Sequence, residues 1–305
     1  MSRGDLARSY RLAARTTRRE AGNFYIAFLS LPRAERRAVY ALYAFFRELD
    51  DAADGAPGKG GIESEGESHF LHSVAAAADP RSVGIARMRE RLARAAAGEP
   101  ESSRDLALAD TIERFSIDVG DLEDVIRGVE TDLGPVEMQT LEGLEDYAYL
   151  VASAVGLATL AILNGGVPPT DEMRERAVRL GLGMQLVNVV RDVGEDASQY
   201  RIYVPQELLA RHGARRASID DGVVTPELRA ALAELGSRAR GHLRAGRELM
   251  PRVPQSSRAC LWLLSEVYGR ILTRIEEARY DVFPARISLP AREKLWLLAT
   301  ARCRI

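Results

Sequence analysis

Residues 184–196 read Met-Gln-Leu-Val-Asn-Val-Val-Arg-Asp-Val-Gly-Glu-Asp. With about 100° between successive residues of a helix, Gln185, Asn188, Asp192 and Asp196 form one polar stripe between leucine and valine flanks. A helix that is apolar on most of its surface is buried, and buried charges need partners or a metal. The alternative, a stripe on the protein surface, would expose five branched apolar side chains. The segment therefore predicts an internal polar site.

The rest of the chain follows the same helical period. Apolar residues recur at i, i+3, i+4 and i+7, Pro and Gly clusters separate the segments, and no stretch alternates as a strand would. We therefore predict an all-α fold of roughly ten helices. The helical segments are 34–54, 82–97, 104–131, 142–164, 171–197, 225–250 and 256–280.

The composition is that of an ordinary globular protein. The 305 residues are 46% hydrophobic and 28% charged, and a net charge of −2 gives no global field that would favour nucleic acid. The two cysteines, Cys260 and Cys303, have neither metal-ligand spacing nor the look of a disulfide framework. No apolar run approaches the ~20 residues of a membrane span, and the start lacks a signal-peptide core. We expect a cytoplasmic protein.

One segment departs from the helical pattern. Residues 55–68 are rich in glycine and polar residues and contain no aromatic side chain, which predicts a flexible loop. The loop directly follows an acidic segment, so a lid over a site and a plain surface loop are both open interpretations.

That acidic segment, residues 47–54, reads Arg-Glu-Leu-Asp-Asp-Ala-Ala-Asp. Asp50 and Asp54 are four residues apart and project from one helical face, with Arg47 and Tyr43 one and two turns earlier on the same side. Like charges at this spacing destabilise a helix slightly, and a divalent cation between them would reverse that effect. Taken alone, the segment fits a solvated helix end equally well.

Two carboxylate-bearing helices without histidine ligands favour a hard cation. Mg²⁺ binds few carboxylates and completes its shell with water and substrate phosphates; Mn²⁺ is the alternative. His69 and His72 lie in a polar region, and His212 and His242 are isolated. The chain contains no P-loop, GxGxxG or Ser-His-Asp order, and we read the glycines of residues 181–183 as close helix packing.

Together these segments resemble the squalene/phytoene synthase family. Tyr-Ala-Leu-Tyr-Ala-Phe-Phe-Arg at 40–47, followed by the aspartates of 50–54, is similar to the first signature of that family. Residues 185–196, followed by Arg-Ile-Tyr-Val-Pro at 201–205, are similar to the second. Residues 146–156 and the pair Gly128 and Asp132 agree, and the resemblance runs from about Asn23 to Lys294.

The resemblance implies one domain over residues 1–305, with its core at about 23–294. The fold would be an isoprenoid synthase-type helical bundle around a central apolar cavity, in which two prenyl diphosphates are joined head to head. The implied metal ligands are Asp50, Asp54, Asn188, Asp192 and Asp196, of which the four aspartates also carry catalysis. The implied substrate-binding residues are Asn23, Phe24, Tyr43, Arg47, Gln185, Arg191, Tyr268 and Arg286.

The implied chemistry also needs a residue that guides the proton loss which closes a cyclopropane. Tyr147 is the candidate for this step, directly or through the departed diphosphate; a core aromatic with a satisfied hydroxyl is the alternative. Glu20 and Gly22 stand where some carotenoid-forming members carry basic residues, which puts a diphosphate contact from that loop in doubt.

Three local motifs favour one branch of the family. Residues 22–25, 47–51 and 151–156 look most like bacterial presqualene diphosphate synthases of hopanoid and squalene routes, which implies farnesyl diphosphate as substrate. The alternative is a phytoene synthase that condenses geranylgeranyl diphosphate. NADPH would be needed only if the reaction continues to squalene. Because the product would be strongly apolar, loose contact of the protein with the inner membrane surface is also an open interpretation. The sequence does not determine the oligomeric state.

Two other classes of protein share part of this pattern. A non-catalytic scaffold or assembly protein with the same fold would be expected to lose its aspartates, since unpaired buried charge is costly. A metal-dependent diphosphate hydrolase would have similar acidic residues but would not need a long dry cavity. Incubation with prenyl diphosphates separates all three classes.

Overall fold

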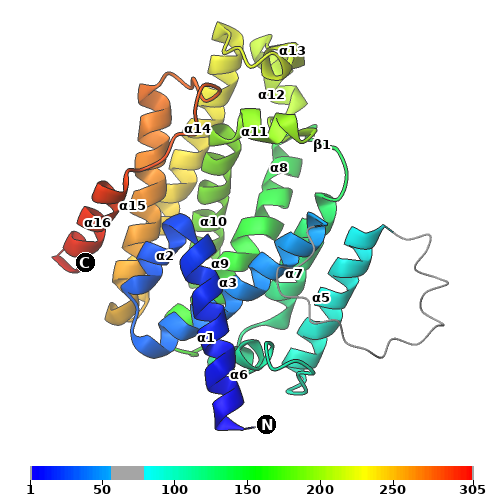
Figure 1. Cartoon of the computed structure of the whole chain (residues 1–305). Coiled ribbons are helices and arrows are strands. Elements are labelled where there is room, and N and C mark those ends of the chain that lie inside the picture. Colours follow the sequence, from blue (N-terminus) through cyan, green and yellow to red (C-terminus); the bar gives the residue numbers. More distant parts are fainter. Residues whose placement is uncertain (1, 56–78, 304–305) are drawn as a thin grey trace.

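The computed structural model describes residues 2–55 and 79–303, and this part of the chain is almost entirely helical, as predicted (Figure 1). The α-helices are α1 (Arg3–Glu20), α2 (Gly22–Leu29), α3 (Arg33–Ala53), α5 (Pro80–Ala96), α6 (Leu106–Phe115), α7 (Val119–Thr131), α8 (Leu141–Ala148), α9 (Ala154–Leu163), α10 (Asp171–Arg191), α11 (Val193–Ser198), α12 (Gln206–His212), α13 (Arg216–Asp220), α14 (Pro226–Arg247), α15 (Gln255–Glu277) and α16 (Ala291–Thr300). A π-helical turn, η1 (Tyr149–Ser153), joins α8 to α9, and two 3₁₀ turns, η2 (Met250–Arg252) and η3 (Ala301–Cys303), flank α15 and α16.

Helix α10 lies at the centre of the bundle and packs against α14, α9, η1 and α15 (Figure 1). Its glycines make this close packing feasible. A Cβ at Gly181 would lie 2.6 Å from the Cα of Ser153 in η1, and a Cβ at Gly183 would lie 2.8 Å from the backbone nitrogen of Leu243 in α14. Both distances are shorter than real side chains allow, so the prediction that these glycines serve helix packing is confirmed.

The helix boundaries differ from the predicted segments in three places. The predicted helix 104–131 is two helices, because Ser116 adopts a left-handed conformation with φ 49° and Asp118 then caps α7. The predicted helix 142–164 contains the turn η1, and 171–197 is interrupted at Asp192, with φ −102° and ψ 13°. The described residues form fifteen α-helices rather than roughly ten, because helices as short as α11 and α13 are too short to show a period.

Two very short strands were not predicted. β1 (Val136–Glu137) and β2 (Arg201–Ile202) pair in parallel, with Val136 opposite Arg201 and Glu137 opposite Ile202. Two residues cannot show the alternation by which strands are recognised in a sequence. The pairing brings the chain that follows α7 beside the chain that follows α11, and this proximity positions part of the site.

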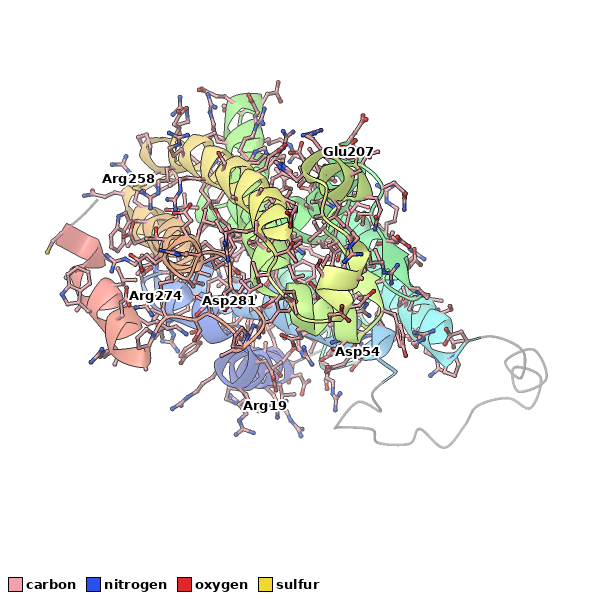
Figure 2. The ribbon with its side chains drawn as sticks, turned by 90° about the horizontal axis from the view of Figure 1, so that it is seen from above. Arg19, Asp54, Glu207, Arg258, Arg274 and Asp281 are labelled. Atoms are coloured by element: carbon pink, nitrogen blue, oxygen red, sulfur yellow. The ribbon has the colours of Figure 1, made fainter. Side chains whose placement is uncertain are left out.

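The core is built from leucine, isoleucine, valine and alanine on the inward helix faces, while charged side chains such as Arg19, Glu207 and Arg258 project from the outside (Figure 2). The expectation that no apolar run matches a membrane span was wrong. Leu141–Leu163 is long and apolar enough by length and composition, with a mean hydropathy of 1.6. However, 56% of that window is buried within the bundle, as is usual for a core helix.

The predicted flexible loop 55–68 lies outside the described residues except for Gly55, and so do His69 and His72. The interpretation of this loop as a lid or a plain surface loop stays a prediction.

Candidate active site

The first acidic segment forms the last turn of α3. Leu49 is fully buried and fixes the inward face of this turn, and the backbone N–H of Asp54 bonds to the carbonyl oxygen of Asp50 at 2.9 Å. The guanidinium of Arg47 donates to Asp51 Oδ1 at 2.6 Å. The prediction placed Arg47 on the side of Asp50 and Asp54, whereas its hydrogen bond goes to the neighbouring carboxylate.

Asp50 is exposed to solvent and yet strongly influenced by the surrounding protein. Desolvation raises the pKa of its carboxyl to about 7, against the opposing charge of Arg47, and the like charges of Asp54 and Asp51 raise it further. Among the described residues the Asp50 carboxyl accepts no hydrogen bond. Exposure combined with desolvation is what a side chain shows when it faces into a cleft rather than into open solvent.

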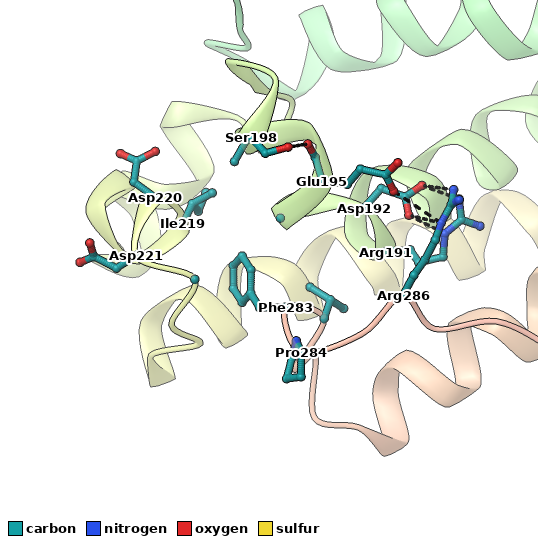
Figure 3. A pocket seen from close by; sticks show the side chains of 14 residues that line it. Arg191, Asp192, Glu195, Ser198, Ile219, Asp220, Asp221, Phe283, Pro284 and Arg286 are labelled. Atoms are coloured by element: carbon teal, nitrogen blue, oxygen red, sulfur yellow. Dashed lines mark hydrogen bonds and ion pairs between the residues drawn. The ribbon is translucent and has the colours of Figure 1, made fainter.

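The second acidic segment spans the junction of α10 and α11. Both oxygens of the Asp192 carboxylate are bound by two guanidinium groups (Figure 3). Arg191 donates to Oδ1 at 2.7 Å and to Oδ2, and Arg286, from the loop between α15 and α16, donates to Oδ1 at 3.0 Å and to Oδ2 at 3.1 Å. The Arg191 side chain is 8% exposed and the Asp192 side chain 12%, so this is a largely desolvated ion pair.

Asp196 lies one turn beyond Asp192, and its backbone N–H bonds to the Asp192 carbonyl oxygen at 2.8 Å. Burial raises the pKa of its carboxyl to about 7, and the charges of Asp192 and Glu195 add to that rise. Asp196 and Asp50 are therefore alike: each is a desolvated carboxyl without a bonded arginine among the described residues. The stripe predicted for this segment persists across the break because the i to i−4 bonds continue.

The amide side of the stripe contains an unsatisfied atom. Asn188 Nδ2 donates to Gln185 Oε1 at 3.1 Å, and Asn188 Oδ1 is buried without a hydrogen-bond partner in the described structure. Tyr268 of α15 lies beside it; burial raises the pKa of this tyrosine, and Arg191 and Asn188 oppose that rise. A buried, unsatisfied carbonyl oxygen costs about 1–3 kcal/mol and is a ligand that a hard cation accepts.

The remaining predicted substrate-binding residues lie on α2 and α3. The Phe24 ring lies 6.1 Å from the ring of Tyr268, so α2 reaches the same region as Asn188. Asn23 is half-buried, and its side chain makes no hydrogen bond with the described residues. Burial raises the pKa of Tyr43 to about 12, while Arg47 opposes that rise. The structure thus places Tyr43 near Arg47 and the end of α3, and Phe24 on the α15 side.

Tyr147 takes part in a compact triangle with two residues that were not predicted as site residues. Its hydroxyl lies 2.8 Å from Asp132 Oδ2 and 3.1 Å from the Tyr203 hydroxyl, and the Tyr203 hydroxyl lies 2.7 Å from Asp132 Oδ1. The two rings stack with centroids 4.9 Å apart. The β1–β2 pairing brings Tyr203, directly after β2, to Asp132, at the end of α7.

Signals for both missed residues were present in the sequence. Asp132 belongs to the segment with Gly128, where a Cβ would lie 2.8 Å from Val151 Cγ1, and Tyr203 belongs to residues 201–205. Both matched family motifs, but nothing in either motif indicated that the two side chains meet.

The triangle lies between the two acidic segments. The charge of Asp132 raises the pKa of Asp50 in α3 and that of Asp196 in α11, and the charge of Asp54 raises the pKa of Asp132. Both acidic segments therefore face one shared region. Within residues 2–55 and 79–303, no three carboxylate, imidazole or thiolate groups lie close enough to hold a metal by themselves. A cation there would need further oxygen ligands, and Mg²⁺ usually takes these from water and phosphate.

The donor set fits such a cation. It offers two desolvated carboxyls without arginine partners, Asp50 and Asp196, and the unsatisfied oxygen of Asn188, all of them hard oxygen ligands. Asp54 and Asp192 complete the predicted ligand set on the same two helix ends, although Asp192 is bound by two arginines.

An open pocket of about 650 Å³ lies beside this site, between α11, α13 and the loop that carries Phe283 and Arg286 (Figure 3). Phe283 seats against the end of the site: a Cβ at Gly194 would lie 2.9 Å from its ring. The pocket is lined by acidic side chains such as Asp220 and Asp221 as well as by Asp192. It is not the long apolar cavity that was predicted between the helices.

Comparison with known proteins identifies the class. The family model for squalene/phytoene synthase matches residues 17–293, so the chain belongs to that family, and the family prediction is confirmed. The chain is 33% identical to the 15-cis-phytoene synthase of Synechococcus elongatus, over 98% of this chain and 94% of that protein. It is also 33% identical to a phytoene synthase of Thermus thermophilus, over 94% and 90%.

Solved structures show the same fold. A dehydrosqualene synthase superposes with a TM-score of 0.84 at 24% identity, over 99% of this chain and 98% of that one. A squalene synthase from Alicyclobacillus acidocaldarius superposes with a TM-score of 0.78 at 27% identity, over 92% and 97%. The predicted all-α, isoprenoid synthase-type fold is confirmed. The chain thus belongs to a family of prenyltransferases that condense prenyl diphosphates head to head.

Proposed function

We propose that this protein is a divalent-metal-dependent prenyltransferase of the phytoene synthase type, which joins two geranylgeranyl diphosphates head to head. The relatives at 33% identity over nearly the whole chain are named phytoene synthases, and this similarity supports the longer substrate. It favours the alternative of our sequence analysis over its first choice, farnesyl diphosphate. The observation that carries the metal-dependent chemistry is the pair of desolvated, arginine-free carboxyls, Asp50 and Asp196, beside one shared region.

The cation would be held by Asp50 and Asp54 on one side and by Asn188, Asp192 and Asp196 on the other. When bound, it would supply positive charge that stabilises the departing diphosphate. The arginines act in the same sense. Arg191 and Arg286 lie on Asp192, and Arg47 lies at the end of α3, so fixed positive charge borders the place where the anion forms.

The allylic cation left behind must be protected from water. Phe24, Val151, Val155 and Met184 are apolar side chains of the core helices that keep part of their surface accessible. Side chains of this kind would be suited to line a chamber for a prenyl chain and to exclude water from it.

A second candidate substrate is farnesyl diphosphate, with presqualene diphosphate or squalene as product. The squalene synthase structure that matches at 27% identity supports this candidate, as do residues 22–25 and 151–156. The two substrates differ by one isoprene unit, so the depth of the chamber decides between them.

The test is incubation with each prenyl diphosphate in the presence of Mg²⁺, with and without NADPH, followed by product analysis. A coupled product from two geranylgeranyl units supports the proposal. A coupled product formed only from farnesyl diphosphate supports the second candidate, and squalene formed only with NADPH would extend it. Prenyl alcohol with free diphosphate would instead indicate a hydrolase, and no turnover of either substrate would indicate a scaffold protein.

A further inference from the structure

The three contacts among Asp132, Tyr147 and Tyr203 form a closed triangle, and the number of protons available to it is informative. Each tyrosine hydroxyl has one proton to donate, and an ionised carboxylate has none. With both hydroxyls donating to Asp132, as the 2.8 Å and 2.7 Å contacts indicate, the 3.1 Å contact between the hydroxyls holds no proton. The triangle therefore has three hydrogen-bonding edges and two protons, and it can accept one more.

The third proton completes the triangle. If Asp132 is protonated, its own O–H bonds to Tyr147, the Tyr147 O–H bonds to Tyr203, and the Tyr203 O–H bonds to Asp132. Every edge then holds one proton, and no heavy atom has to move by more than a hydrogen-bond adjustment.

The surroundings favour this protonation. Burial raises the pKa of the Asp132 carboxyl, while the hydrogen bonds from Tyr203 and Tyr147 and the charge of Arg201 oppose the rise. The charge of Asp54 raises this pKa as well. Arg201 donates to the backbone carbonyl oxygen of Asp132 at 3.2 Å rather than to its carboxylate, so the carboxylate stays able to take a proton.

Tyr147 is buried to 8% exposure, on the helix segment that continues through η1 into α9, and the triangle lies between the two acidic segments. Asp132 itself is half-buried, and a proton released in the region that these segments share would be released beside the triangle.

We propose that Asp132 and Tyr203 act as positioning residues of a proton relay, in which Asp132 is the final acceptor of the proton that the prenyl intermediate loses through Tyr147. This inference rests on the proposed head-to-head condensation. The C–H bond of the cationic intermediate breaks, and its electron pair closes the cyclopropane. The proton adds to the Tyr147 oxygen, and the proton that Tyr147 already carried moves to Asp132 Oδ2.

Charge and atoms balance in this step. A carbocation and a carboxylate become a neutral cyclopropane and a neutral carboxylic acid, with no oxidant or further reactant. The acid returns its proton afterwards to the released diphosphate or to water. A tyrosine alone could not serve as the acceptor, because a protonated phenol is far too acidic to persist; the relay to Asp132 removes that difficulty.

The experiment measures how the chain partitions the prenyl cation between coupled product and hydrolysed alcohol. Asp132→Asn keeps the size of the side chain and an acceptor oxygen but cannot take the proton as a carboxylate does. We expect its ratio of coupled product to released diphosphate to fall about 10²-fold, the contribution typical of a positioned base. Release of the first diphosphate should stay near the wild-type rate. Substrate deuterated at the carbon that loses the proton should show a larger isotope effect in this variant.

Tyr203→Phe keeps the ring stack but removes two edges of the triangle, so the partition ratio should fall by a smaller factor, about tenfold. A matched control exists elsewhere in the chain. Tyr10 lies 2.6 Å from Asp110 Oδ2 and 3.1 Å from the Thr111 hydroxyl, a similar cluster between α1 and α6. Asp110→Asn should leave the partition ratio unchanged, and thermal unfolding should show that every variant is folded.

Three outcomes of this experiment would overturn the proton relay. An unchanged partition ratio and isotope effect in Asp132→Asn would overturn the relay and leave the proposed condensation standing. An equal fall in first diphosphate release and in coupled product would assign Asp132 a purely structural role and also overturn it. If the wild-type protein couples neither prenyl diphosphate, the proposed function fails, and the relay fails with it.

Discussion

The end of α3 and the α10–α11 junction have the same residue types, aspartates four apart with an arginine nearby. In the folded protein, however, their carboxylates have different hydrogen-bond partners. At the junction, Asp192 is held by Arg191 and by Arg286. At the end of α3, Arg47 bonds Asp51, and Asp50 accepts no hydrogen bond from the described residues. The two segments therefore hold their charge differently before a cation binds: two arginines compensate the charge of Asp192, whereas desolvation raises the pKa of Asp50 to about 7, so this carboxyl keeps its proton only below that pH.

The largest effect should come from removing one carboxylate of either segment. Asp50→Asn and Asp192→Asn should each lower turnover about 10³-fold, roughly 4 kcal/mol of barrier, because both leave the departing diphosphate without part of its charge stabilisation. Turnover at saturating Mg²⁺ and circular dichroism measure activity and fold. The control is Asp220→Asn, an exposed aspartate of α13 in the neighbouring pocket, which should retain activity. Full activity in either site variant would show that the metal assignment is wrong.

Substitutions in the two segments should change the free energy of unfolding in opposite directions. Without metal, Asp192→Asn should lower the free energy of unfolding by about 1–3 kcal/mol, because the buried Arg191 loses its charged partner. Asp50→Asn should instead raise it at about pH 8, since the folded protein then no longer holds a desolvated carboxylate. Urea unfolding of both variants measures the difference. A lower free energy of unfolding in both variants would mean that the protein compensates the charge of Asp50, as the arginines compensate that of Asp192.

The sign of the pH dependence follows from the raised pKa of Asp50. The folded state binds this proton more tightly than the unfolded state, so the destabilisation is absent below about pH 4 and complete above about pH 7. The stabilising effect of Asp50→Asn should therefore disappear in acid. Equal effects at both ends of the range would contradict the charge state assigned to Asp50.

Metal binding should displace the protons held by Asp50 and Asp196. The apparent affinity for Mg²⁺ should then rise with pH up to about 7, by up to about tenfold per unit for each proton released. Titration calorimetry in two buffers with different ionisation enthalpies counts those protons. Asp50→Asn should reduce the count, and Asp220→Asn should not. An affinity that does not change between about pH 5 and 7 would exclude this linkage.

The smallest effect should come from Arg286. Its side chain is 58% exposed, so Arg286→Ala should change stability by about 1 kcal/mol or less. The same change should strengthen Mg²⁺ binding a few-fold, because Asp192 is relieved of one competing cation, and should raise KM for the prenyl diphosphate. The control is Arg229→Ala, whose guanidinium bonds the carbonyl oxygen of Arg279 away from the site. Unchanged or weaker Mg²⁺ binding in Arg286→Ala would show that this arginine does not compete for Asp192.

The sequence by itself determined the features that depend on local period. Apolar spacing predicted the helices, and the 100° stripe placed Asn188, Asp192 and Asp196 on one side of a buried segment, because a residue's direction on a helix depends only on its neighbours. The same reasoning predicted the packing role of Gly181 and Gly183. Helices of five or six residues were not predicted in this way, because they are shorter than two turns.

Only the tertiary structure decided which groups compensate one another. Arg286 reaches Asp192 across 94 positions, and Tyr203 reaches Asp132 across 71, so neither pair leaves a periodic signal in the sequence. The pKa values of Asp50 and Asp196 likewise depend on how much protein surrounds them, which follows from helix packing and not from the motif. The acidic residues could be found from the sequence, while their charge states and the proton-accepting triangle required the packed bundle.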